Sequence, residues 1–394
     1  MLSTATSIRS YVESVAKTET SRQSRWRIYA RPEMDEALHA WRRLEVELNE
    51  TRFANSATWI NCWLRHYGDC VPHHVLALEQ AGEVRGLTLV TAGQQQKLGP
   101  FDLRTCHLGT AGEIPGESVV VEYNRPLVAP GYEAEFAEGV WAHLQHDLKW
   151  EQLRLDGVHA DDLQEWSRIL PDADVRRRES RYFDLQLTRD AGHDVLQQLG
   201  SSTRSNIRRR LKKYGTLEGE WIDSVETAAD AFEELITLHQ ARWQAVGQPG
   251  AFAAPRFLEF QRELVIRMVA EQRAVMFRVR HEGETVGCLF LLNDGGRLLD
   301  YLSGFASFEE KPSIGLVSHY LCMQAALERG FAAYDFLVGE KQHKQNLSNA
   351  ATELCWLTWT RPSWKACCYE GLRSAKRLLK AWCKPAQTSN QKSE

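Results

Sequence analysis

The sequence lacks the features that would place it in a membrane, outside the cell or on nucleic acid. No stretch approaches eighteen uninterrupted apolar residues, the length that a membrane-spanning helix needs. The N-terminal residues have no charged segment followed by an apolar core, so we expect no secretory signal and predict a cytoplasmic protein. The formal net charge is only −4, which gives no reason to expect a nucleic-acid partner.

The sequence also has no CxxC pair among its nine cysteines. Most of the cysteines lie within apolar runs, where cysteine behaves as a small hydrophobic residue, so we expect free thiols in a reducing compartment. The close histidine groupings, His73 with His74 and His143 with His146, have no convincing set of carboxylate or cysteine partners. The sequence therefore predicts neither a disulfide framework nor a metal site.

What the chain does have is the composition of a folded protein and an internal repeat. Its 394 residues, 43% hydrophobic and 25% charged, suffice for two domains. Residues 76–89 resemble residues 277–290, and three positions match at one offset: Gly82 with Gly283, Glu83 with Glu284, and Gly86 with Gly287. Each copy predicts a hairpin that a helix precedes (57–67 and 257–270). We therefore predict a duplicated α/β fold, a mixed sheet with flanking helices.

The second copy has a loop that the first copy lacks. Pro312-Ser313-Ile314-Gly315 stands directly before an apolar ladder at helical spacing, formed by Leu316, Tyr320, Met323 and Leu327. The unpaired amides at such a helix start and the helix dipole favour an anion such as a pyrophosphate. The alternative is an ordinary helix start capped by the serine. Between the copies, the polar stretch 171–180 is expected to be a connector, with a strand over 182–187.

Several further segments carry a family resemblance. These segments are the helix with Arg204, Asn206 and Arg208, followed by Tyr301-Leu302-Ser303-Gly304-Phe305, Ser313-Ile314-Gly315-Leu316, Tyr334-Asp335-Phe336, Gly339-Glu340 and Lys344. Together they resemble the acetyltransferases of the cellulose-biosynthesis (CelD-like) type. These belong to the GNAT superfamily and are relatives of the Fem-type aminoacyltransferases. The likeness covers roughly 26–362. It implies two GNAT-like domains in tandem, at 25–187 on the acceptor side and at 188–363 with the acyl donor.

The resemblance also implies a reaction. It predicts an N-acyltransferase that takes acyl-CoA, in particular acetyl-CoA, as co-substrate, needs no metal, and acts on an amine-bearing sugar, free or lipid-linked, of a surface polysaccharide. The residue before Lys344, usually aromatic in the family, is His343, which leaves the acceptor less defined than the donor. Aminoacyl transfer from tRNA is an alternative, although 215–273 has room for only a strand and two helices and not for a coiled-coil arm. The other alternative is that the protein is a non-catalytic scaffold.

The expected site residues divide by role. The amides of Ser313, Ile314, Gly315, Leu316 and Val317 would hold the CoA pyrophosphate, and the strand that ends at Gly304 would pair with its pantetheine arm. Tyr301 would donate a proton to the leaving group, or is simply a half-buried strand aromatic. Asp335 would be the general base, or a structural ion pair with Lys344 as its natural partner. Lys344 would otherwise face the acceptor, and His319 is an alternative base or acceptor contact.

Two basic segments lie outside these expected site residues. Arg204 and Arg208 would clamp an acceptor phosphate, or belong to a solvated helix face. Residues 364–384 predict a basic amphipathic helix that packs on its own domain or contacts the inner face of the membrane. Residues 1–24 are expected to be an N-terminal extension, and 385–394 a disordered tail.

Overall fold

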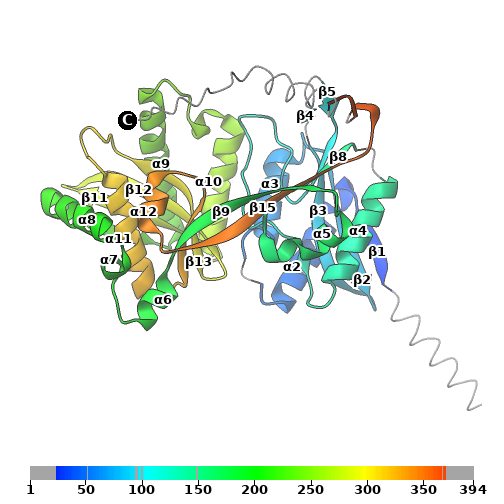
Figure 1. Cartoon of the computed structure of the whole chain (residues 1–394), viewed down its shortest axis with the longest axis horizontal. Coiled ribbons are helices and arrows are strands. Elements are labelled where there is room, and N and C mark those ends of the chain that lie inside the picture. Colours follow the sequence, from blue (N-terminus) through cyan, green and yellow to red (C-terminus); the bar gives the residue numbers. More distant parts are fainter. Residues whose placement is uncertain are drawn as a thin grey trace, which may run out of the picture.

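The computed structural model describes residues 24–50, 52–93, 96–98, 101–147, 150–365 and 367–369. A single mixed sheet of 13 strands runs through both halves of this part of the chain, in the order β1-β2-β3-β6-β8-β15-β9-β14-β13-β12-β11-β10, with β7 paired to β3. Helices flank the sheet in each half (Figure 1). The predicted fold class, a mixed α/β sheet with flanking helices, is confirmed.

The first half contains one copy of the repeat. The predicted helix over 57–67 and the predicted Gly-Glu hairpin are both present. Its elements are β1 (Arg25–Tyr29), α2 (Met34–Glu47), α3 (Ala57–Tyr67), β2 (His73–Gln80), β3 (Glu83–Ala92), β6 (Thr105–Leu108), β7 (Leu127–Val128), α4 (Glu133–Asp147), β8 (Gln152–His159) and α5 (Gln164–Ile169), with a short hairpin of β4 (Gln96–Leu98) and β5 (Phe101–Leu103).

The second half repeats this order. Its hairpin, β11 with β12, pairs as β2 does with β3, and a long helix precedes it. Its elements are α8 (Ser201–Tyr214), β10 (Glu218–Ile222), α9 (Val225–Ala245), α10 (Pro255–Ala270), β11 (Ala274–His281), β12 (Glu284–Asp294), β13 (Arg297–Phe305), α11 (Ile314–Glu328), β14 (Ala333–Val338) and α12 (Gln342–Leu347). Two short helices, α6 (Leu185–Asp190) and α7 (Val195–Gln198), precede α8.

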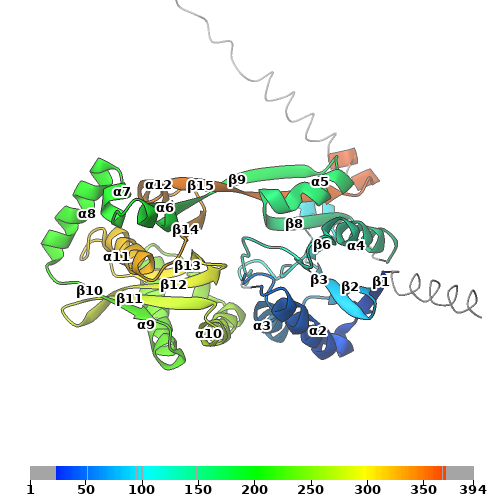
Figure 2. The ribbon, with the colours of Figure 1, turned by 90° about the horizontal axis from the view of Figure 1, so that it is seen from below.

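Two long strands join the halves. β9 (Asp174–Asp184) pairs with β14 of the second half, and β15 (Ala350–Thr360) pairs with β8 of the first half and with β9 along its length. Figure 2 shows β9 and β15 running side by side across both halves. The predicted connector at 171–180 is therefore wrong, because most of it is a sheet strand, and residues 185–187 begin α6 rather than ending a strand. The expected domains 25–187 and 188–363 share one sheet.

Helix packing also crosses between the halves. The Trp59 ring of α3 lies edge-on to the Phe260 ring of α10, with centroids 5.8 Å apart. His66 and Glu263, further along these helices, approach to 2.7 Å. Burial of large aromatic rings is worth several kcal/mol per residue, so this contact fixes the halves against each other.

The two ends of the chain lie mostly outside the described residues. This applies to 1–23 of the expected N-terminal extension, to the tail at 385–394, and to the predicted basic helix at 364–384 beyond its first few positions. Across the part of the chain that the structure describes, no helix combines the length and the apolar character that crossing a bilayer requires.

Candidate functional site

Strands β13 and β14 separate in the middle of the second half. They pair in parallel only from Arg297 to Leu299 on β13, whereas β12 stays paired with β13 as far as Phe305. Leu337 then turns the end of β14 away, with a φ of 58°. A cavity of about 710 Å³ fills the opening between the two strands. Beyond Leu299 the edge of β13 thus faces a cavity in place of a neighbouring strand.

The start of α11 forms one wall of this cavity. Ser313 adopts a left-handed conformation (φ 63°) that turns the chain into the helix, and the Tyr214 hydroxyl fixes the turn by donating to the Pro312 carbonyl at 2.9 Å. The amides of Gly315 and Leu316 have no acceptor among the described residues. Both residues line the cavity. The loop therefore presents free N–H groups and the positive end of the helix dipole, which suits an anion.

Not all of the predicted donor residues reach the cavity. Ser313, Gly315 and Leu316 line it, whereas the side chains of Ile314 and Val317 are buried in the protein core. Gly304 does not line the cavity either. A methyl group at this position would overlap the Leu235 carbonyl of α9, so Gly304 is required by the close approach of this helix to β13.

Asp300 is the acidic residue that lines the cavity. It is the first residue of β13 beyond the pairing with β14, its side chain is only 10% exposed, and it lines the cavity. Its Oδ1 atom is buried and has no hydrogen-bond partner among the residues that the structure describes, and its Oδ2 lies 3.8 Å from His319 Nε2. Burial raises the pKa of Asp300 to about 6. A carboxylate with a free oxygen and such a pKa is suited to accept a proton near neutral pH.

The sequence analysis missed Asp300, although a signal was present. It is the one acidic residue in the otherwise largely apolar strand Arg297-Leu298-Leu299-Asp300-Tyr301-Leu302-Ser303-Gly304-Phe305. A buried acid within such a strand needs a physical reason. The Tyr334-Asp335-Phe336 motif, which carries part of the family resemblance, indicated Asp335 instead.

His319 lines the cavity but is a poor base. Its Nδ1 lies 2.9 Å from the Tyr334 hydroxyl, and its ring stacks on that of His343 at 5.7 Å between centroids. Burial, with a contribution from Lys344, lowers the pKa of His319 to about 3. Burial likewise lowers the pKa of His343 to about 4. Both imidazoles are therefore neutral at physiological pH and form a polar but uncharged wall.

Tyr301 lines the cavity beside Asp300. Its hydroxyl accepts a hydrogen bond from Gln261 Nε2 at 3.0 Å, and burial raises the pKa of the phenol well above its usual value. The hydroxyl proton has no acceptor elsewhere in the described chain. Tyr301 therefore stays protonated, and its hydroxyl lies beside Gln261 of α10.

Asp335 is fully buried and has all the partners that a structural carboxylate needs. It accepts hydrogen bonds from the Tyr123 hydroxyl (2.5 Å), Ser180 (2.7 Å), the Leu337 amide (2.7 Å) and Arg297, with which it forms an ion pair at 2.8 Å. It does not line the cavity. This geometry favours the alternative that Asp335 forms a structural ion pair. The expectation that Lys344 is its partner was wrong, because Arg297 is the cation of this pair.

Lys344 instead holds the end of β14. Its ammonium donates to the carbonyls of Phe336, Leu337 and Val338, the last two at 3.1 Å. Burial lowers the pKa of Lys344, while Asp300 and Glu122 raise it. Lys344 lines the cavity, yet its hydrogen bonds are directed to the backbone. It positions the strand end and contributes a fixed positive charge.

Comparison with known proteins identifies this half of the chain. Residues 201–345 match the model of the acetyltransferase (GNAT) domain. This range contains the cavity loop, β13 and β14. The second half is therefore a GNAT domain, and the chain is an acyltransferase of the GNAT type.

The whole structure is similar to several solved structures at low sequence identity. They are FemX (12% identity, TM-score 0.50, covering 75% of this chain and 90% of that one), the C-terminal domain (DUF2156) of a putative lysylphosphatidylglycerol synthetase from Agrobacterium fabrum (12%, 0.52, 87% and 96%) and L-PGS from Bacillus licheniformis (11%, 0.50, 87% and 96%). These likenesses show a common fold. Among curated proteins, none matches this sequence significantly. The resemblance to the cellulose-biosynthesis type stays a prediction.

A smaller cavity of about 220 Å³ lies between the GNAT domain and the first half. It shares Asp300, Tyr301 and Lys344 with the larger cavity. The first half contributes Phe53, Val120 and Glu122 to its wall. Sequence reasoning missed these three residues, because no local motif indicates that they meet the GNAT domain.

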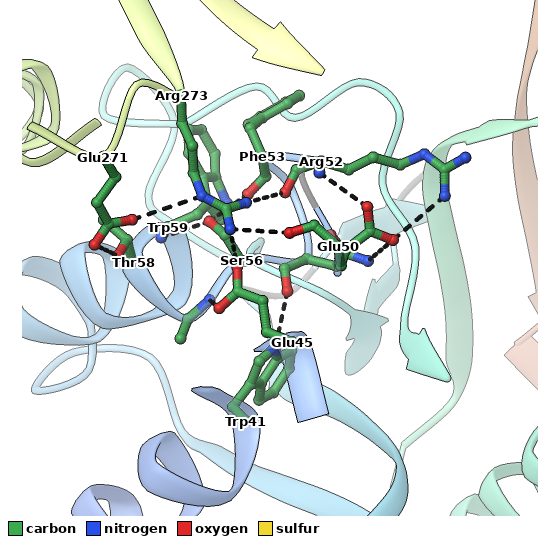
Figure 3. A network of polar contacts seen from close by, with 12 residues as sticks. Trp41, Glu45, Glu50, Arg52, Phe53, Ser56, Thr58, Trp59, Glu271 and Arg273 are labelled. Atoms are coloured by element: carbon green, nitrogen blue, oxygen red, sulfur yellow. Dashed lines mark hydrogen bonds and ion pairs between the residues drawn. The ribbon is translucent and has the colours of Figure 1, made fainter. Parts of the chain in front are cut away.

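A polar network holds the loop that carries Phe53. Arg273 of the GNAT domain donates to the backbone carbonyls of Arg52 (2.8 Å) and Glu50 (3.1 Å) and pairs with Glu45 at 2.5 Å (Figure 3). On the other side of the loop, the Phe53 amide donates to Asp294 Oδ1 at 3.2 Å. Residues of the GNAT domain thus position a loop of the first half at the shared cavity.

Arg204 and Arg208 lie on α8, away from both cavities. Neither lines either cavity, and Arg208 is exposed. Helix α8 packs its apolar residues, among them Ile207 and Leu211, against the core of the GNAT domain. The predicted helix and its end at Gly215 are present, and this placement favours a solvated basic face over an acceptor clamp.

Proposed function

We propose that this protein is an acyl-CoA-dependent N-acyltransferase with one donor site, in the GNAT domain. The observation that carries the proposal is the free Oδ1 of Asp300 at the point where β13 and β14 separate. A buried carboxylate without a partner is costly in a folded protein, and a proton-accepting role accounts for it.

The cavity fits the co-substrate in three respects. Its volume of about 710 Å³ lies in the range of ligand pockets. The free amides of Gly315 and Leu316 suit a pyrophosphate, and the open edge of β13 after Leu299 suits a pantetheine arm. When bound, an acyl-CoA supplies an activated thioester carbon.

The residues around the thioester can complete the transfer. Asp300 takes a proton from the amine of the acceptor, whose nitrogen then forms a bond to the acyl carbon as the carbon–sulfur bond breaks. Tyr301 donates its proton to the departing sulfur and is reprotonated from solvent, while Asp300 releases to solvent the proton that it took from the amine. The amine becomes an amide and the co-substrate leaves as a free thiol, so protons and electrons balance.

Leu316 provides a test that separates binding from folding. Leu316→Glu places a negative charge where the pyrophosphate is proposed to bind, while a negative charge in the first turn stabilises a helix. Leu316→Gln is the matched neutral control. By isothermal titration with acetyl-CoA, we expect the glutamate variant to bind at least about tenfold more weakly than the glutamine variant. Absence of binding by the wild type, or equal affinities of the two variants, would overturn the proposal.

Aminoacyl transfer is the second candidate. The similarity of fold to FemX and to lysylphosphatidylglycerol synthetase supports keeping it. Transfer of a labelled amino acid from aminoacyl-tRNA, together with no binding of acetyl-CoA, would favour this alternative. The amino-sugar acceptor implied by the family resemblance is a further alternative, which the acceptor experiment below includes.

A further inference from the structure

We propose that the 220 Å³ cavity between the halves is the acceptor subsite, that it takes the primary ammonium of an amine with a mainly apolar body, and that Glu122 of the first half binds this ammonium. The inference rests on the proposed function, because it uses Asp300 as the proton acceptor. It adds the chemical class of the acceptor and a specificity residue.

The two cavities meet at the reacting groups. Asp300, Tyr301 and Lys344 line both of them, so a donor in the larger cavity and an acceptor in the smaller one would converge on the same carboxylate. The Asp300 side chain is nine-tenths buried, and its Oδ1 has no partner. That unpaired oxygen at the shared wall is an observation independent of the cavity shape.

Most of the side chains that line the smaller cavity are apolar. Apart from Glu122 and the three shared residues, it is lined by Phe53, Val120, Leu292, Leu299, Leu337 and Val338. Val120 is 63% exposed, an unusually high exposure for an aliphatic side chain at a cavity mouth. Apolar side chains are favourable for a hydrocarbon body, whereas each hydroxyl group of a sugar that is buried against them needs a polar partner.

The charges in the cavity favour a cation. Glu122 and Asp300 carry negative charge when ionised, and Lys344 carries the single positive charge among the lining residues. The Lys344 ammonium is committed to three backbone carbonyls. One negative charge is therefore left over, and an incoming ammonium neutralises it, whereas a phosphate would add to the excess.

Glu122 is placed to act as the anchor. One of its oxygens, Oε2, accepts a hydrogen bond from the Val338 amide at 2.8 Å, which fixes the carboxylate against the end of β14. Burial raises the pKa of Glu122, with Lys344 acting in the opposite direction. A bound ammonium would favour the ionised form. The first half thus supplies the group that recognises the acceptor, and the GNAT domain supplies the chemistry.

The test measures acetyl transfer to three probe amines by release of the CoA thiol, at saturating acetyl-CoA. The probes are phenethylamine, glucosamine and glucosamine 6-phosphate. For the wild type we expect kcat/KM to be at least about tenfold higher with phenethylamine than with either sugar. Glu122→Gln keeps the shape and the bond to Val338, and we expect it to raise KM for phenethylamine about tenfold or more with kcat changed far less.

A matched control removes the same charge elsewhere. Glu353→Gln affects an exposed ion pair with Arg177 and lies outside both cavities, so KM should stay at the wild-type value. Isothermal titration of all three proteins with acetyl-CoA forms the second arm. If acetyl-CoA does not bind, the proposed function fails. If it binds, but phenethylamine is not acetylated, a sugar is preferred, or Glu122→Gln leaves KM unchanged, the acceptor inference alone is overturned.

Discussion

The carboxyl group of Asp300 occupies an environment that opposes its charge. Its burial, with Oδ1 unpartnered, disfavours the ionised form, so its pKa lies at about 6 in the folded protein. In an unfolded chain an aspartate has a pKa of about 3.9. The folded protein therefore holds this proton more tightly than the unfolded chain does. The residue that we propose to accept a proton is thus one that weakens the fold at neutral pH.

The first prediction concerns stability. Because the folded-state pKa of Asp300 is raised, the free energy of unfolding falls as the pH rises from about 4 to about 6 and stays lower above that range. Asp300→Asn resembles the protonated form, so we expect it to be more stable than the wild type by about 1–3 kcal/mol at pH 8 and equal to it near pH 4. Urea denaturation at both pH values measures this, with the exposed position Asp172→Asn as control.

The second prediction concerns activity. Since the proton acceptor must be ionised, kcat/KM should rise with pH on an acid limb with a midpoint near pH 6. Asp300→Asn should lower kcat by about a hundredfold or more while leaving acetyl-CoA binding intact. Initial rates between pH 4.5 and 8 measure the limb. An unshifted limb in the asparagine variant, with activity retained, would assign the proton transfer to another group.

Single residues also mark the limit of sequence reasoning. Gly315 and Leu316 were predictable because a local turn and a helical ladder define them. Asp300 acquires its properties from the separation of two strands, which depends on the path of β14 after Leu337. Asp335 shows the converse, since its motif is local but its partners come from three other segments.

Among the elements, the end of β14 depends on one side chain. Three consecutive carbonyls converge on the Lys344 ammonium, and the left-handed conformation of Leu337 makes this convergence possible. A methyl group added to Gly339 would lie 3.0 Å from the same nitrogen. This strand end lines both cavities, so its geometry would set the distance between the proposed donor and the proposed acceptor.

The third prediction replaces this ammonium. Lys344→Met keeps the length of the side chain but leaves the three carbonyls without their donor, so we expect a loss of about 2–4 kcal/mol in the free energy of unfolding. Lys341→Met, at an exposed position nearby, should change it by less than about 0.5 kcal/mol. Both values come from urea denaturation at pH 7. Equal stability of the two variants would instead favour Lys344 as a group free to face the acceptor.

The elements themselves were predicted unevenly. Both hairpins, with helices α3 and α10, follow local periodicity and turn residues, and the sequence was sufficient for them. β9 was not predicted over 174–180, because this segment is rich in arginine and aspartate and carries no apolar alternation. It is a strand since β15 and β14 pair with its two edges, which is a long-range effect.

At the scale of the whole molecule, the contact between the halves builds the smaller cavity, which we propose to bind the acceptor. Arg273 directly precedes β11 but binds the loop of the first half that carries Arg52 and Phe53, and Phe53 lines that cavity. Its partner Glu45 has a side chain only 10% exposed, and burial raises the pKa of Glu45 while Arg273 lowers it. This ion pair therefore connects the stability of the contact between the halves to the position of Phe53.

The last prediction tests this connection. Arg273→Met leaves the Glu45 carboxylate buried without its cation, and we expect a loss of about 3–5 kcal/mol in the free energy of unfolding. Adding Glu45→Gln removes that charge and should recover about 1–3 kcal/mol, a coupling that a double-mutant cycle in urea measures.

In the stabler double variant, KM for phenethylamine should rise, because the loop with Phe53 has lost its bonds to Arg273, whereas the Kd of acetyl-CoA should not change. Every residue that lines the larger cavity, where we propose that acetyl-CoA binds, belongs to the second half, so acetyl-CoA binding provides an internal control. A parallel weakening of both ligands would mean that the variant disturbs the whole fold. Unchanged binding of both would mean that Phe53 has no part in acceptor recognition.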